Sequence, residues 1–257
     1  MAVFMMAPLL ALVPISFSDS SFLSYPIHGW SLQWYERVFT PGPWLDSLRN
    51  SVLVGIASTL ISTVLGTLAA LAFARRNLPR ATGILGVLIS PMIIPPVISG
   101  LGMYFLFGKI GLTGTLSGLI LAHTVLATPF VLISVAACLQ GFDMTLLRAA
   151  AMLGASPTKA FMNVALPIIS PGIISGALFA FMTSFDEIVV VLFVGGPSQR
   201  TLPRQMFDGI RDTIDPSIVA MSSFLLLLAI VGLVSTTWLA VRAQQASKGL
   251  SLPSTNK

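Results

Sequence analysis

The stretch LRAAAMLGASPTKAF, residues 147–161, lies between two long apolar segments of this 257-residue chain. It carries three consecutive alanines, then Gly154, and then Ser156 followed by Pro157. Glycine most easily adopts the left-handed backbone with which many helices end, and serine before proline is a common helix start. The stretch therefore predicts a helix, a tight turn and a second helix.

The ends of this helical hairpin follow from the residues around it. Asp143 precedes the first helix and can accept hydrogen bonds from its free amides, while Pro167 is expected to end the second helix. The first helix offers small side chains to a partner and the second offers apolar ones: Ala149, Ala150 and Ala151, then Phe161, Val164 and Leu166. A hairpin lying on the membrane surface is the alternative. Such helices usually carry many basic residues, whereas this stretch holds Arg148 and Lys159 alone, so a protein partner is the better interpretation.

The composition is that of a polytopic membrane protein. Hydrophobic residues make up 55% of the chain and charged residues 9%, against about 25% charged residues in an ordinary soluble domain. The length leaves room for one helical bundle and no sizeable soluble domain, so chemistry that needs a folded aqueous site must come from partners. Cys138 is the single cysteine, which excludes an internal disulfide.

Six transmembrane helices are predicted, because several segments contain about 20 residues with almost no charge, the length that crosses a hydrocarbon core. We expect an all-α bundle that forms a single domain over residues 1–257, with a loop at 140–168 and a disordered tail at 245–257. Prolines and glycines within the spans allow kinks and close helix approach. The expected spans are about 1–16, 50–73, 84–107, 116–139, 169–194 and 217–241. The first is short and has no leading basic residue, so a retained span is favoured over a cleaved signal peptide.

The distribution of basic residues predicts the orientation, since short cytoplasmic loops retain positive charge. One set of loops holds eight basic residues with Asp143 as its single acid: Arg75, Arg76, Arg80, Arg148, Lys159, Arg242, Lys248 and Lys257. The other set balances its bases with acids: Arg37, Arg49, Lys109, Arg200, Arg204 and Arg211 against Asp19, Glu36, Asp46, Asp208, Asp212 and Asp215. We therefore expect the first set and both termini in the cytoplasm. The net charge of +5 is then explained by basic residues that face anionic lipid at the inner membrane surface, and binding to nucleic acid is not needed to explain it.

The hairpin resembles the EAA loop of permease subunits in ATP-binding-cassette importers, whose pattern is E-A-A-x3-G-x9-I-x-L-P. Arg148, Ala149 and Ala150 begin the match, Gly154 stands at the expected offset, and VALP at 164–167 completes it. The resemblance implies that the loop couples the bundle to a cytoplasmic ATPase subunit. The implied coupling residues are Arg148, Ala149, Ala150, Gly154, Ala155, Ser156, Phe161, Leu166 and Pro167. Arg148 replaces the family's glutamate, so any contact made by that glutamate cannot be carried over.

The resemblance extends over most of the chain, which is similar to the permeases of polyamine importers. The matching segments are SFSDSSF (16–22), WSLQWY (30–35), NSVLVG (50–55), LGTLAALAFAR (65–75), SPMIIPPVISG (90–100), LILAHTVLATPFV (119–131), SFDEIVVVLFVGGP (184–197) and TLP (201–203). It implies a multi-pass protein of the bacterial inner membrane with four kinds of partner: two ABC ATPase subunits, a second and different permease, an external solute-binding protein, and membrane lipid. ATP and magnesium would be bound by the ATPase subunits. Relatives import other small organic solutes and metal complexes, so those substrates remain alternatives.

Two acidic residues, Asp186 and Glu187, lie within the expected fifth span. A carboxylate in hydrocarbon costs at least about 2.5 kcal/mol, so each should face a partner, a cavity or a pathway. Read as one helix, adjacent residues point about 100° apart, so one ligand would not use both. We expect at least one of them to attract an organic cation, with an interhelical ion pair or a hydrogen bond as the alternative. Four further pathway candidates are open to plain packing roles: Phe185, Phe181, Tyr104 and His123.

Other classes of protein are less well supported. The chain has no G-x-x-x-x-G-K-[ST] phosphate loop, so energy from ATP must come from another subunit. An ion-coupled secondary transporter or channel that uses Asp186 and Glu187 is the competing class, but the sequence shows no internal repeat and we expect no helix broken at midplane. The loops contain neither a cluster of nucleophile and base nor a metal-binding cluster, which are the signs of an enzyme. We therefore expect neither catalytic residues nor a cofactor.

Overall fold

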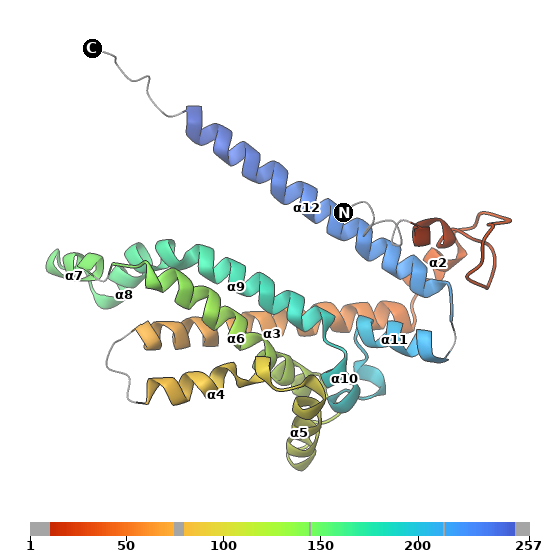
Figure 1. The fold of residues 1–257 in the computed structure, drawn as a ribbon, viewed down its shortest axis with the longest axis horizontal. Coiled ribbons are helices and arrows are strands. Elements are labelled where there is room, and N and C mark those ends of the chain that lie inside the picture. Colours follow the sequence, from red (N-terminus) through yellow and green to blue (C-terminus); the bar gives the residue numbers. More distant parts are fainter. Residues whose placement is uncertain (1–10, 75–79, 144, 213, 250–257) are drawn as a thin grey trace. The chain divides into compact units, whose positions relative to one another are not determined.

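The computed structural model describes residues 11–74, 80–143, 145–212 and 214–249. Over these residues the secondary structure is helical, and an isolated antiparallel bridge between Ser18 and Trp30 stands outside any strand. The all-α prediction is therefore confirmed. The chain divides into two compact units, residues 43–207 and residues 1–42 together with 208–257, and the ribbon of each can be followed in Figure 1.

The larger unit, residues 43–207, is built around three long helices. They are α3 (Pro43–Ala74), α6 (Leu116–Gln140) and α9 (Leu166–Asp186), which pack against one another (Figure 1). Along α3 the buried positions recur at helical spacing and are mostly small: Ser47, Ser51, Gly55, Ser58, Ser62, Gly66 and Ala70. Small residues let helix backbones approach closely. A Cβ on Gly66 would lie 2.6 Å from Cβ of Val131, and one on Gly176 would lie 2.9 Å from Cα of Val131. These glycines set the close packing of the three helices.

Three helices in the described residues are long and apolar enough to cross a membrane: 43–74, 116–140 and 157–186. The first two contain the spans expected at 50–73 and 116–139. The count becomes four if a bent pair, α4 (Ala81–Ile93) and α5 (Pro96–Lys109), is taken as one span. The apolar part of α12 (Ser217–Gly249), residues 217–232, is shorter.

The span expected over 84–107 is not one helix. It is divided between α4 and α5, whose axes differ by 107°. Ile94 and Pro95 are extended, and Pro96 is the first residue of α5. A residue before proline is forced away from helical backbone, and two consecutive prolines apply this restriction twice. The Pro95–Pro96 pair therefore breaks the span rather than kinking it.

The fifth expected span also differs. The helix starts at Pro157 with α8 (Pro157–Ala160), continues through a π-helical segment (Phe161–Ala165), and runs to Asp186 as α9. Pro167 was expected to end this helix but lies in its first turn after the π segment, where the Leu166 amide bonds to the Phe161 carbonyl. A proline ring clashes with the carbonyl four residues earlier in a regular α-helix, and a wider π turn removes that clash. The helix then stops at Asp186, short of the expected end at 194.

A second break in the larger unit follows at residues 187 and 188. A short helix, α10 (Val189–Val194), comes next and packs against α5. Gly100 makes this contact possible, because a Cβ at that position would lie 2.7 Å from the Phe193 ring. A 3₁₀ turn (Pro197–Gln199) and α11 (Leu202–Asp212) complete the unit, whose boundary falls within α11.

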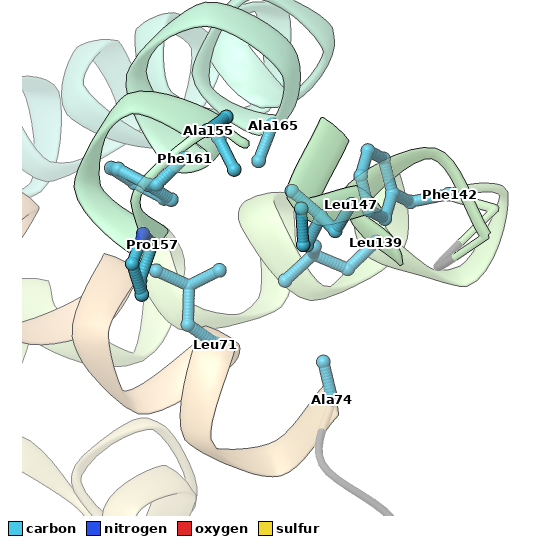
Figure 2. Close-up of a pocket in the computed structure, with 11 residues that line it drawn as sticks. Leu71, Ala74, Leu139, Phe142, Leu147, Ala155, Pro157, Phe161 and Ala165 are labelled. Carbon is cyan, nitrogen blue, oxygen red and sulfur yellow. The ribbon is translucent and has the colours of Figure 1, made fainter. Parts of the chain in front are cut away.

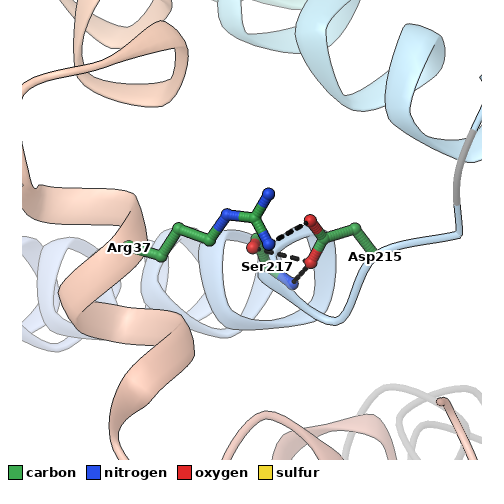
Figure 3. A network of polar contacts seen from close by, with 3 residues as sticks. All are labelled: Arg37, Asp215 and Ser217. Carbon is green, nitrogen blue, oxygen red and sulfur yellow. Dashed lines mark hydrogen bonds and ion pairs between the residues drawn. The ribbon is translucent and has the colours of Figure 1, made fainter. Parts of the chain in front are cut away.

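The smaller unit joins the segment before residue 43 to α12. Its short helix α2 (Gln33–Phe39) buries Trp34, whose indole N–H donates to the Ser18 carbonyl at 2.8 Å. Arg37 pairs with Asp215 at 2.9 Å, and the same carboxylate accepts from the amide and hydroxyl of Ser217 at the start of α12 (Figure 3). Most of the span expected at 1–16 lies outside the described residues. The tail expected from 245 is helical as far as Gly249.

Candidate functional site

The predicted helical hairpin is present, and its turn has the hydrogen bonds that end a helix at glycine. The first helix is α7 (Thr145–Met152), and Gly154 follows with a φ of +83°. The Gly154 amide donates to the Ala151 carbonyl and the Ala155 amide donates to the Ala150 carbonyl, both at 3.0 Å. These two bonds form a Schellman motif, which requires left-handed backbone at the glycine. The prediction for Gly154 is confirmed.

Both helices of the hairpin begin at side-chain caps. Ser156 Oγ accepts from the Lys159 amide at 3.4 Å, and Pro157 is the first helical residue. Asp143 Oδ1 accepts from the Thr145 amide at 2.9 Å. Hydrogen bonds from the side chain and amide of Thr145, and then the charge of Arg148, lower the pKa of the Asp143 carboxyl from its usual value. The carboxylate is the form that caps, so the start of α7 is fixed at neutral pH.

The outer surface of the hairpin is exposed and partly apolar. Arg148, Ala149 and Gly154 are exposed, whereas Ala150 is half-buried. Met152 and Leu153 stand out, because each is 88% exposed. The alanines were predicted from the sequence as contact residues, whereas Met152 and Leu153 were not. The available signal was a pair of large apolar residues directly before the glycine that ends the helix.

An apolar cavity of about 390 Å³ lies beneath the hairpin (Figure 2). The hairpin contributes one side of it, and the ends of α3 and α6 contribute the other. The lining residues of this loop cavity are Leu71, Ala74, Leu139, Phe142, Leu147, Ala151, Ala155, Pro157, Ala160, Phe161 and Ala165. Phe161 also packs against the core of the bundle. Its side chain therefore lies on the inner side of the hairpin and not on the outer surface. Leu166 is half-buried and Pro167 exposed, within the continuous helix.

The two acidic residues lie at the far end of that helix. Asp186 is the last residue of α9, and Glu187 has an extended backbone, so the expected helical offset of about 100° between them does not apply. Glu187 Oε1 accepts from the Val190 amide at 2.8 Å and thus caps α10. Asp186 is exposed, and its carboxylate has no hydrogen bond or ion pair to another described residue. The structure therefore distinguishes the two residues: Glu187 caps α10, and the exposed Asp186 carboxylate has no partner among the described residues.

The aromatic candidates do not form one wall. Phe181 and Phe185 stack on α9 with centroids 5.7 Å apart, and Phe181 rests against Gly55, where a Cβ would lie 3.0 Å from its ring. Tyr104 lies on α5, is 44% exposed, and contacts the ring of Phe105 edge-on. Phe185 is the aromatic side chain next in sequence to Asp186 and is half-buried.

His123 lies inside the bundle. It is 1% exposed, and its Nδ1 forms a 2.8 Å hydrogen bond with Ser184 Oγ. Ser58 donates to the same Ser184 oxygen at 3.0 Å, so the three side chains join α6, α9 and α3. Nε2 of His123 has no partner among the described residues. This burial places His123 in helix packing rather than on an open surface.

Comparisons with known proteins assign the chain to a transport family. The family described as "Binding-protein-dependent transport system inner membrane component" matches residues 62–246, more than half of the chain. The putrescine transport system permease protein PotI of Escherichia coli is 32% identical over 251 residues, covering 94% of this chain and 88% of PotI. The spermidine/putrescine permease PotC of Haemophilus influenzae is 30% identical over 224 residues, covering 87% and 86%. The molybdenum transport system permease protein ModB of Mycobacterium bovis is 31% identical, covering 71% and 75%.

Solved structures show the same fold. A bacterial ABC transporter that imports the acidic polysaccharide alginate superposes with a TM-score of 0.72 at 14% identity, covering 92% of this chain and 91% of that one. An amino acid ABC transporter superposes with a TM-score of 0.57 at 19% identity, covering 79% and 94%.

Proposed function

Because this chain belongs to the family of binding-protein-dependent transport system inner membrane components and has the fold of a type I importer transmembrane domain, we propose that it forms half of the pathway for a polyamine. In this proposal the chain acts as a single transport domain that hydrolyses no ATP itself. It works with two cytoplasmic ABC ATPase subunits, a second permease and an external binding protein. The similarity to putrescine and spermidine/putrescine permeases over most of the chain supports the substrate class.

The hairpin is proposed as the docking site of the ATPase. Its outer surface presents small and apolar side chains around a backbone fixed by the Schellman motif. Met152 and Leu153 leave most of their apolar surface in contact with solvent, and burying it against a partner would contribute about 25 cal/mol per Å². Arg148 lies on the same helix and offers a cation to an acidic residue of the ATPase. The proposed coupling surface therefore consists of Arg148, Ala149, Ala150, Met152, Leu153 and Gly154.

The other predicted coupling residues support this surface from within. Phe161 and Ala155 line the loop cavity, Ser156 caps the second helix, and Leu166 with Pro167 connects the π segment to α9. Motion of the docked hairpin would reach the membrane through these residues, because α8, the π segment and α9 are continuous. Both termini and the hairpin are proposed to face the cytoplasm of a bacterial inner membrane, in agreement with the basic residues in those loops.

Asp186 is proposed as the acid that attracts the polyamine. Its exposed carboxylate has no partner among the described residues, and it stands at the carboxyl end of a long helix, where the helix dipole adds partial negative charge. Both effects favour an ammonium group. Glu187 is proposed as the structural partner that holds α10, because one of its oxygens is occupied by the Val190 amide. Phe185 and Tyr104 are retained as aromatic contacts, and His123 as a packing residue.

A molybdenum-type oxyanion is the second candidate substrate, supported by the 31% identity to ModB. The two substrates make opposite demands on charge, since an oxyanion would be repelled by the Asp186 carboxylate. The exposed carboxylate of Asp186, without a partner in the described part of the chain, is the observation that favours the cation.

Uptake by the reconstituted complex tests the proposed function. Proteoliposomes containing this chain, the second permease and the ATPase would be supplied with the binding protein and labelled putrescine, spermidine or molybdate. We expect ATP-dependent accumulation of a polyamine, and no accumulation when the ATPase is omitted. Accumulation without the ATPase would identify a secondary transporter, and transport of molybdate alone would overturn the assignment of substrate.

A further inference from the structure

The last turn of α9 carries both the exposed carboxylate of Asp186 and a buried hydroxyl. Ser184 is 5% exposed and faces the interior of the bundle, whereas Asp186, two residues later, is exposed and ends the helix. The backbone is extended at Glu187, so no further helical turn follows to support this one. The last turn of a helix has free carbonyl groups and frays easily. Contacts made by its side chains therefore determine how firmly Asp186 is held.

The Ser184 hydroxyl ties this turn to two neighbouring helices. Its Oγ lies 2.8 Å from Nδ1 of His123 on α6 and 3.0 Å from Oγ of Ser58 on α3, both hydrogen-bond distances. All three side chains are buried, with exposed fractions of at most 5%. One turn earlier on α9, the Phe181 ring packs on Gly55 of α3. The end of α9 is thus held against α3 and α6 by side chains that lie inside the bundle.

Stability alone does not account for a histidine at position 123. Residues of α6 within one turn of it belong to apolar clusters of the core: Leu119, Ala122, Leu126 and Ala127. The Nε2 atom of His123 is closed to solvent and has no hydrogen-bond partner among the described residues. Such an atom is costly to bury, and an apolar pair of the same shape can be as stable as a buried hydrogen bond. The position that Nδ1 gives to Ser184 is the better explanation for this side chain.

We infer that His123 and Ser184 are positioning residues for Asp186, because their hydrogen bond holds the end of α9 and so presents the carboxylate in one place. This inference rests on the proposed function, in which Asp186 attracts the polyamine. Both side chains are buried, so neither one touches the substrate itself. Without the bond, the last turn of α9 samples other arrangements, and a smaller fraction of complexes presents the carboxylate correctly. The apparent affinity for the polyamine falls by that fraction.

Two substitutions remove the hydrogen bond and keep the interior apolar: Ser184→Ala and His123→Leu. Uptake of labelled putrescine or spermidine by the reconstituted complex would be measured together with the melting temperature of the permease. We expect each variant to raise the KM for uptake about two- to tenfold, the equivalent of one hydrogen bond, with the maximal rate and the melting temperature close to wild type. His123→Asn should keep the wild-type KM, because the asparagine amide can replace Nδ1 as the partner of Ser184.

The matched control is Ser175→Ala, which makes the same chemical change on the same helix. The Ser175 hydroxyl donates to the Gly172 carbonyl at 3.2 Å, within α9, so its loss should leave the KM unchanged. Combining Ser184→Ala with Asp186→Asn tests whether the hydroxyl acts through the carboxylate. The double variant should have the KM of Asp186→Asn alone, whereas two independent sites would multiply their effects.

Multiplied effects in the double variant would overturn the inference. Equal responses of Ser184→Ala and Ser175→Ala would also overturn it, and so would a lowered melting temperature in Ser184→Ala with a wild-type KM, which is the result expected of a purely structural contact. A wild-type KM in Asp186→Asn, or a wild-type complex that transports no polyamine, would instead overturn the proposed function.

Discussion

Replacing Gly154 with alanine isolates the conformation of the hairpin from its contacts. The φ of Gly154 is +83°, and a Cβ built at this position meets no atom within 4 Å. The substitution therefore adds no clash, and its cost is the left-handed backbone alone, about 1–2 kcal/mol for a residue with a Cβ. That energy lowers the population of the Schellman turn by about 5- to 30-fold relative to competing loop conformations.

We expect the dissociation constant between the permease pair and the ATPase to rise by the same factor for Gly154→Ala, as measured by titrating the ATPase into the purified permeases. ATP-driven uptake at limiting ATPase should fall in parallel. Gly154→Asn should recover most of the affinity, because asparagine tolerates left-handed backbone better than other residues with a Cβ. Gly83→Ala is the control, since Gly83 also has open space around its Cβ position but lies within α4. Wild-type affinity in Gly154→Ala would refute the view that this turn shapes the docking surface.

Three further predictions concern the hairpin and the acidic helix end. Met152→Asp and Leu153→Asp should each weaken ATPase co-purification at least about tenfold without lowering the thermal stability of the permease, because both side chains are 88% exposed in the isolated chain. Asp186→Asn should raise the KM for polyamine uptake about tenfold or more, whereas Glu187→Gln should leave this KM unchanged. Glu187→Ala should lower the free energy of unfolding by about 1 kcal/mol, because the cap of α10 is lost. Folding lowers the pKa of the Asp143 carboxyl from 3.8. The ionised carboxylate therefore stabilises the start of α7 fully above pH 3.8, and this stabilisation is lost as the pH falls through the lower pKa of the folded state. The rate of uptake should therefore show no change due to Asp143 between pH 5 and 8. In hydrogen-exchange measurements at acid pH, the wild type should lose protection in the hairpin, and Asp143→Asn should not show this pH-dependent loss.

Local signals predicted the hairpin well. Gly154, Ser156 and Asp143 act through hydrogen bonds to residues within five positions, so their geometry is encoded in a short window. The spans at 50–73 and 116–139 were equally accessible, because length and apolar composition determine whether a helix can cross a membrane. In each case the controlling interactions lie within one element.

The breaks at 94–95 and 187–188 were not predicted, for two different reasons. The Pro95–Pro96 pair signalled the first break, but the continuous apolar segment around it favoured the prediction of one unbroken span. Nothing comparable marks residue 187, where the helix ends and Glu187 turns back to cap α10. The burial of His123 and the inward direction of Phe161 also depend on helices distant in sequence, which composition does not reveal.

The continuity of α8, the π segment and α9 has a mechanical consequence. A straight lever of 30 residues is about 45 Å long, so a tilt of about 10° at its hairpin end displaces the Asp186 end by about 8 Å. The π-helical turn at 161–165 belongs to this helix and lies close to the hairpin. If the hairpin docks on an ATPase as proposed, a small movement of that subunit would displace the Asp186 carboxylate by several ångströms, enough to change its exposure to a substrate.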